Sequence, residues 1–106
     1  QTDALEFVNE LLAELLQTAS RLLRKGGEFW IVYPTERLAD LVYGLRGVGL
    51  EPKQLRLVHS HGASEAQRLV LGAVRGARPG MRVGAPLCIY DGSGAYTPEV
   101  ARMLAP

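Results

Sequence analysis

Residues 22–33 read LLRKGGEFWIVY, and this stretch is the strongest indication of the fold. It combines the end of a helix, two glycines and an apolar, aromatic segment. Gly26 can adopt the left-handed backbone conformation that closes a helix. The run FWIVY over 29–33 shows no alternation of apolar and polar residues, which is typical of a parallel strand covered on both faces. The stretch therefore predicts a helix followed by a buried strand of an α/β sheet, with Phe29 and Trp30 in the core.

The segment before the glycines, residues 3–25, is predicted to be a long amphipathic helix. Its apolar residues recur at spacings of three and four and form one stripe: Leu5, Val8, Leu12, Leu15, Ala19 and Leu22. Asp3 and Glu6 resemble a capping box at its start. The stripe persists for about three heptads, so a coiled-coil or dimerising helix is an alternative to packing on a sheet. Further leucines widen the apolar face beyond a narrow seam, which favours the sheet.

The residues after the strand continue the α/β pattern. Thr35 is predicted to cap a helix that starts at Glu36 and ends near Gly47. Two strands, 54–60 and 67–75, follow, and a connection of hairpin length joins them, so we expect them to be antiparallel.

The last quarter of the chain is rich in turn signals. Glycine and proline predict a loop over 76–84, and a short apolar strand is expected over 86–90. Thr97, Pro98 and Glu99 then predict a short closing helix, with the threonine as its cap.

Composition indicates a globular chain of 106 residues with 47% hydrophobic residues, 22% charged residues and a formal net charge of +1. The net charge gives no bulk electrostatic signal for nucleic acid. Arginine outnumbers lysine ten to two, which either suits phosphate binding or reflects genomic base composition. The single cysteine, Cys88, cannot form an internal disulfide, and no apolar run of about 20 residues is present. We therefore expect a cytoplasmic protein without a membrane partner.

Several motifs along the chain resemble those of one enzyme family. They are KGG before the strand, ERL at 36–38, EPK-x-LR-x-VH at 51–59 and the closing PL-x-IY…G-x-YTPE at 86–99. Together they resemble the C-terminal half of a class I S-adenosylmethionine-dependent methyltransferase, in particular the bacterial tRNA (adenine-N6)-methyltransferases that act on a valine tRNA. The resemblance implies an α/β fold, the C-terminal portion of a Rossmann-like methyltransferase sheet. Its order would be helix, parallel strand, helix, parallel strand, antiparallel strand, short C-terminal strand and helix.

The same resemblance implies a function. Residues 1–106 would form a single partial domain, and the N-terminal cofactor-binding half would be absent. The family's cofactor loop, acidic ribose ligand and Asn-Pro-Pro-aromatic motif would all precede Gln1, so no catalytic or cofactor-binding residue is assigned. The intact enzyme is expected to methylate N6 of adenine in tRNA with S-adenosylmethionine. This piece would supply outer strands, covering helices and the substrate edge. Alone, it is expected to be inactive and to bind no cofactor.

Topology predicts where the substrate would lie. Open α/β sheets bind ligands beyond the carboxyl ends of their parallel strands, which here are 33–37 and 59–61. Five residues at this edge are candidates for RNA contacts, and solvated loop residues are the alternative for each: Thr35, Arg37, His59, His61 and Arg68.

Two further assignments concern the side chains near this edge. Tyr96 either stacks on a base or packs against the start of the closing helix. A metal site is not expected, because His59 and His61 lack a third ligand.

The resemblance also implies which partners to expect. They would be tRNA and the missing N-terminal half in the intact enzyme. Without that half, the strand 29–33 would have an unpaired edge. We therefore expect the piece to self-associate through this edge or through the stripe of helix 3–25. The alternative function is a stand-alone, non-catalytic α/β binding or dimerisation module.

Overall fold

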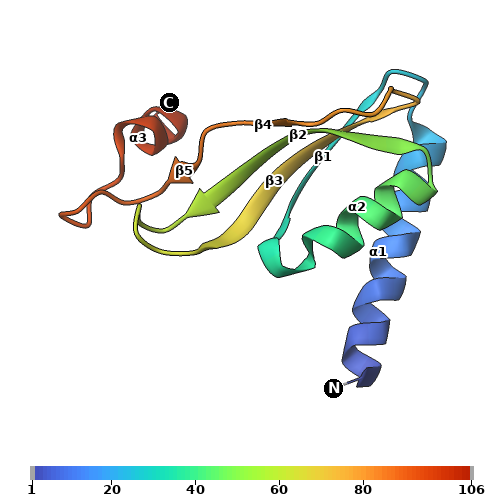
Figure 1. Cartoon of the computed structure of the whole chain (residues 1–106), viewed down its shortest axis with the longest axis horizontal. Coiled ribbons are helices and arrows are strands. Elements are labelled where there is room, and N and C mark those ends of the chain that lie inside the picture. Colours follow the sequence, from blue (N-terminus) through green and yellow to red (C-terminus); the bar gives the residue numbers. More distant parts are fainter. Residues whose placement is uncertain (1, 106) are drawn as a thin grey trace.

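The computed structural model describes the backbone of residues 2–105 and the side chains of residues 4–105. A five-stranded sheet with helices beside it makes up the molecule (Figure 1). In chain order, the elements are α1 (Thr2–Leu22), β1 (Glu28–Pro34), the 3-10 turn η1 (Thr35–Arg37), α2 (Leu38–Gly47), β2 (Leu50–His59), β3 (Ala66–Arg75), β4 (Arg82–Val83), β5 (Leu87–Cys88) and α3 (Pro98–Leu104). The predicted α/β class is confirmed.

The sheet has the strand order β1-β3-β2-β4, and β5 also pairs with β2. β3 lies between β1 and β2 and is antiparallel to both, so β1 and β2 run in the same direction without being neighbours. The predicted antiparallel pairing of the two longest strands is confirmed. β2 begins at Leu50, earlier than predicted, and takes in Pro52 beside a register shift, a position where a strand tolerates a proline.

The core lies between the sheet and the two helices α1 and α2, which cover the same face. Six leucines are fully buried there: Leu16, Leu41, Leu45, Leu50, Leu69 and Leu71. β1 contributes every second residue to this core, namely Phe29, Ile31 and Tyr33. This alternation follows from the strand period of two.

The opposite face of β1 is open, and the prediction that both of its faces are covered is wrong for the described residues. Trp30 is 50% exposed and Val32 is 65% exposed, so Trp30 is not a core residue. Its indole lies over Gly72, its cross-strand partner on β3, and its Nε1 donates to Glu28 Oε1 at 3.1 Å. The physical reason is that α1 and α2 both lie on the other face.

β1 is an edge strand of the sheet. It pairs with β3 alone, so its outer edge is unpaired within residues 2–105. The unpaired edge predicted for this strand is confirmed, whereas self-association through it stays a prediction. Within the same residues, no helix has both the length and the apolar character that crossing a membrane requires.

The helix ends differ from the predictions in ways that contacts explain. α1 ends at Leu22 rather than Lys25, and Gly26 has a φ of +84°, as predicted for a closing glycine. The predicted capping box depends on Asp3, whose side chain lies outside the described residues. Thr35 does not cap a helix, because its hydroxyl donates to Ala66 O at 2.6 Å and α2 begins only after η1.

The C-terminal segment is more closely tied to the sheet than predicted. The expected loop over 76–84 contains β4, which pairs in parallel with Gln54 and Leu55 of β2. Thr97 occupies the N-cap position of α3, but its hydroxyl donates to Cys88 O at 2.6 Å instead of capping. Arg56 holds α3 against the sheet through Glu99 Oε1 at 2.6 Å.

Candidate functional site

The ends of β1 and β2 lie together at the start of β3, as the topology predicts. Pro34 pairs with Arg68, and His59 pairs with Ala66. We call this region, residues 33–37 and 59–68, the carboxyl edge. It brings together the five residues predicted to contact RNA, but their side chains have different environments.

Thr35 and Arg68 line one polar cleft of about 340 Å³ at this edge, together with Pro34, Glu36, Glu65, Ala66 and Gln67. Arg68 is exposed, and its Nη1 donates to Gln67 O at 3.0 Å. The hydroxyl of Thr35 already donates a hydrogen bond to Ala66 O. One guanidinium and two carboxylates therefore give this cleft its charge, which makes it unsuited to binding several phosphates.

Arg37 lies outside this cleft and joins α1 to the turn before α2. Its Nε donates to the Tyr33 hydroxyl at 3.3 Å, and its Nη2 donates to Asn9 Oδ1 on α1. It also forms an ion pair with Asp40 at 3.5 Å. The hydrogen bond with Tyr33 is the main cause that raises the pKa of Arg37 above its ordinary value. These contacts tie the turn before α2 to α1, and the predicted RNA contact of Arg37 stays a prediction.

The two histidines lie at the end of β2, and both contact Ser64 of the following loop. His59 Nδ1 is 2.7 Å from Ser64 O, which closes the loop between β2 and β3. Ser64 Oγ also accepts a hydrogen bond from the backbone N–H of His61 at 3.0 Å. Among the described residues, no group of three His, Cys, Asp or Glu side chains is arranged to hold a metal ion.

A hairpin with two stacked tyrosines lies next to His61, and this pairing was not predicted from the sequence. Tyr90 and Tyr96 pair across it and stack with ring centroids 5.6 Å apart and an interplanar angle of 14°. His61 lies beside Tyr90 at 5.8 Å between centroids. Tyr90 is 37% exposed and Tyr96 is 51% exposed. The turn signal DGSG between two tyrosines is the sequence feature that predicts this pairing.

The turn of this hairpin is held by Asp91. Its Oδ1 accepts hydrogen bonds from Ser93 Oγ at 2.7 Å, Ser93 N at 2.8 Å and Ala95 N at 3.1 Å. These bonds favour the ionised carboxylate and lower the pKa of Asp91, with the Ser93 hydroxyl as the largest cause. The turn thus fixes the two tyrosines at defined positions.

A second, mostly apolar groove of about 320 Å³ lies on the open face of the sheet. It runs between the strands and the C-terminal segment, and Trp30, Arg56, Val70, Arg82 and Met103 are among its lining residues. None of the residues predicted to contact RNA lies in it. The groove and the carboxyl edge are therefore separate features of this molecule.

A solved structure resembles this fold closely. It is the crystal structure of a predicted O-methyltransferase, protein Atu636 from Agrobacterium tumefaciens, with a TM-score of 0.80 and 26% sequence identity. The similarity covers 88% of this chain and 45% of that chain. No family model and no curated protein matches the sequence. The chain therefore has a methyltransferase-like fold and spans less than half the length of that relative.

Proposed function

We propose that this chain is the C-terminal part of an S-adenosylmethionine-dependent methyltransferase that methylates N6 of adenine in tRNA. The observation that carries the proposal is the insertion of β3, antiparallel, between the parallel strands β1 and β2. The structural match to the predicted O-methyltransferase, which covers 88% of this chain, supports the proposal. The resemblance of the motifs at 36–38, 51–59 and 86–99 to the tRNA enzymes supports the narrower assignment. The cytoplasm would be the site of action.

In the proposal, the cofactor site lies outside the carboxyl edge. The turn after β1 contains Thr35, Glu36 and Arg37 rather than a glycine-rich loop, and the hydroxyl of Thr35 donates to Ala66 O. In the proposal, S-adenosylmethionine supplies the methyl group and the N-terminal half of the enzyme holds it. That half would pair with the free edge of β1.

The chain's own contribution would be to position the substrate. Methyl transfer to an amine depends mainly on the alignment of the reacting atoms, and an adenine must leave its stack to be reached. The aromatic hairpin offers Tyr90 and Tyr96, whose rings are partly exposed, for stacking by such a base. His61 and Arg68 remain candidates for contacts to the same nucleotide.

A methyl-transfer assay on the complete gene product tests this function. Tritiated S-adenosylmethionine and unmodified tRNA are incubated with the enzyme, and the tRNA is digested and its nucleosides are separated. We expect the label in N6-methyladenosine. Label in a 2′-O-methylated nucleoside or in a small molecule would contradict the adenine assignment, and an absence of transfer to every acceptor would contradict the methyltransferase proposal.

The piece itself provides a second test. Calorimetric titration of the 106-residue chain with S-adenosylmethionine should give no binding heat at micromolar cofactor. Clear binding would contradict the proposal that the N-terminal half of the enzyme holds the cofactor.

A stand-alone binding or dimerisation module is the second candidate function. The unpaired edge of β1 and the exposed apolar residues of α1 favour it. The two functions differ in what covers these surfaces, which is the N-terminal half in the first and a second copy in the other. Methyl transfer by the complete gene product separates them.

A further inference from the structure

Charge is distributed very unevenly over this chain, although its formal net charge is only +1. Three segments, 21–28, 46–53 and 75–82, contain eight arginines and lysines and two acidic residues. The rest of the chain contains four arginines and nine acidic residues. A net charge of +6 in the three segments is therefore offset by −5 elsewhere, and the whole-chain value conceals both.

The fold brings these three segments together at one end of the sheet. Gly26 N donates to Arg75 O at 2.8 Å, and Gly76 N donates to Gly49 O at 3.0 Å. Lys53 Nζ donates to Arg78 O at 2.8 Å. The turn after α1, the start of β2 and the segment after β3 are therefore adjacent. We call the cations gathered here the basic end: Arg24, Lys25, Lys53, Arg75, Arg78 and Arg82.

Acidic side chains do not neutralise the basic end. Within the described residues, none of its six cations forms an ion pair. Of the two acidic residues in the three segments, Glu51 is paired with Arg46 at 2.8 Å, and Glu28 accepts a hydrogen bond from Trp30 Nε1 at 3.1 Å. Arg75 and Lys53 donate to the backbone carbonyls of Leu23 and Arg78 instead, which leaves their positive charge uncompensated. Arg24, Lys25, Arg78 and Arg82 are exposed.

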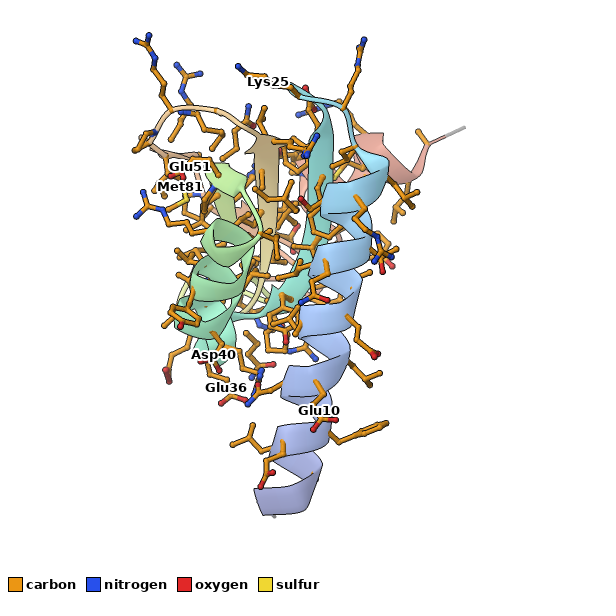
Figure 2. The ribbon with its side chains drawn as sticks, turned by 90° about the vertical axis from the view of Figure 1, so that its right-hand side faces the viewer. Glu10, Lys25, Glu36, Asp40, Glu51 and Met81 are labelled. Atoms are coloured by element: carbon orange, nitrogen blue, oxygen red, sulfur yellow. The ribbon has the colours of Figure 1, made fainter. Side chains whose placement is uncertain are left out.

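The carboxyl edge is at the other end of the strands, and its two arginines, Arg37 and Arg68, are balanced by Glu36 and Glu65. Figure 2 shows Lys25 at one end of the molecule and Glu10, Glu36 and Asp40 toward the other. β2 has 10 residues, which corresponds to about 30 Å at the usual rise per residue. A polyanion would therefore be attracted more strongly to the basic end than to the formally neutral carboxyl edge.

We propose that the basic end binds the phosphate backbone of the RNA substrate, while the base to be modified is presented at the carboxyl edge. The inference rests on the proposed function for the identity of the nucleic acid. Four of the six cations of the basic end are arginines, and arginine forms bidentate hydrogen bonds with phosphate oxygens. Phosphate contacts supply most of the affinity of proteins for nucleic acids, and they need cations without acidic partners. The carboxyl edge lacks such a group of cations, whereas the basic end has one.

Binding of a fluorescein-labelled RNA stem-loop, followed by anisotropy at several salt concentrations, tests the proposal. The variants are K25Q and a triple variant R24Q/K25Q/R78Q, and circular dichroism checks their fold. R102Q is the matched control for K25Q, because Arg102 is exposed on α3 and its loss changes the net charge equally. Each phosphate contact contributes about 0.7–0.9 to the salt slope. The triple variant should therefore lose about 2 from the slope of log K against log salt, whereas R102Q should bind like the unchanged chain.

Three outcomes would overturn the proposal. They are an absence of RNA binding at low salt, an equal loss of binding in K25Q and R102Q, and a preference for vesicles containing phosphatidylserine over RNA. The methyl-transfer assay is independent of this measurement. Binding through the basic end without methyl transfer would contradict the proposed function alone, and methyl transfer to tRNA with unchanged binding by the triple variant would contradict this inference alone.

Discussion

Trp30 and Gly72 face each other across β1 and β3 and show how one small residue shapes the open face of the sheet. A Cβ atom at position 72 would lie 2.7 Å from Trp30 Cη2. Only a residue without a side chain lets the indole lie flat on the neighbouring strand. The same contact keeps the sole tryptophan of the chain against the sheet, although it is half exposed.

Gly72→Ala should displace this indole. We expect a loss of about 1 kcal/mol in the free energy of unfolding, at the low end for overpacking because a half-exposed ring can move. Tryptophan fluorescence should shift toward the emission of a solvated indole. Chemical denaturation measures the first effect and an emission spectrum the second.

Gly84→Ala serves as the control, because its added Cβ would meet only Leu55 O, at 3.9 Å. In a Trp30→Ala background, Gly72→Ala should have no such cost. An equal loss of stability in both backgrounds would show that the indole contact is not the cause.

At the residue scale, hydroxyl groups were the least predictable feature. Thr35 and Thr97 occupy positions that predict helix caps, yet both donate to backbone carbonyls of other segments. Ala66 O is 31 residues from Thr35 in sequence. A local pattern contains no information about a partner that distant, so the cap prediction for Thr35 was wrong. Thr97 does occupy the predicted N-cap position of α3, but its hydroxyl donates to Cys88 O, nine residues away, and makes no capping hydrogen bond.

At the scale of elements, α1 has two apolar faces, of which one is buried and the other is exposed. Leu12 and Leu16 pack toward α2 and the sheet and are buried. Val8, Leu11, Leu15 and Leu22 are spaced along a neighbouring face and are 41%, 50%, 49% and 81% exposed. Helical periodicity predicts that all these residues are apolar neighbours, but it does not tell which face meets the sheet.

Leu16→Ala and Leu15→Ala form a matched pair that tests this assignment. Leu16 is fully buried, and its Cδ1 would be 2.9 Å from a Cβ at Gly44 of α2. Its truncation should lower the free energy of unfolding by about 2–5 kcal/mol. Leu15→Ala should change it by less than about 0.5 kcal/mol, as is usual at an exposed site. Urea denaturation measures both, and equal losses would contradict the packing described for α1.

At the scale of the whole molecule, the chain is more open than a compact domain. Its radius of gyration is 15.5 Å, against about 13 Å for a compact domain of this length. The openness arises because both large helices cover one face of the sheet, while β1 and the second face of α1 lack cover within residues 2–105. An apolar surface of this kind favours association with another surface.

The isolated chain should therefore self-associate as its concentration rises. Sedimentation velocity over a concentration series should show species larger than the monomer. Val32→Lys on β1 and Leu15→Glu on α1 should each shift the distribution toward the monomer, since a charge opposes edge pairing and apolar docking. Tyr43→Glu, at a residue of α2 that is 84% exposed and belongs to neither surface, is the control. A monomer at the highest concentration would contradict this prediction.

The sequence by itself determined the three helices, the three long strands and the directions of those strands. Gly26 ended the first helix, FWIVY formed a strand, and the short connection between β2 and β3 made them antiparallel, because these features depend on residues close in the chain. It also located the carboxyl edge, since strand direction alone places both ends together.

Only the tertiary structure decided which face of β1 is open, which stripe of α1 is buried, and where the hydroxyl of Thr35 donates. It also gathered the cations from three segments into one basic end. These features depend on contacts between residues far apart in the chain. Such contacts arise from packing in three dimensions, and neither composition nor periodicity contains them.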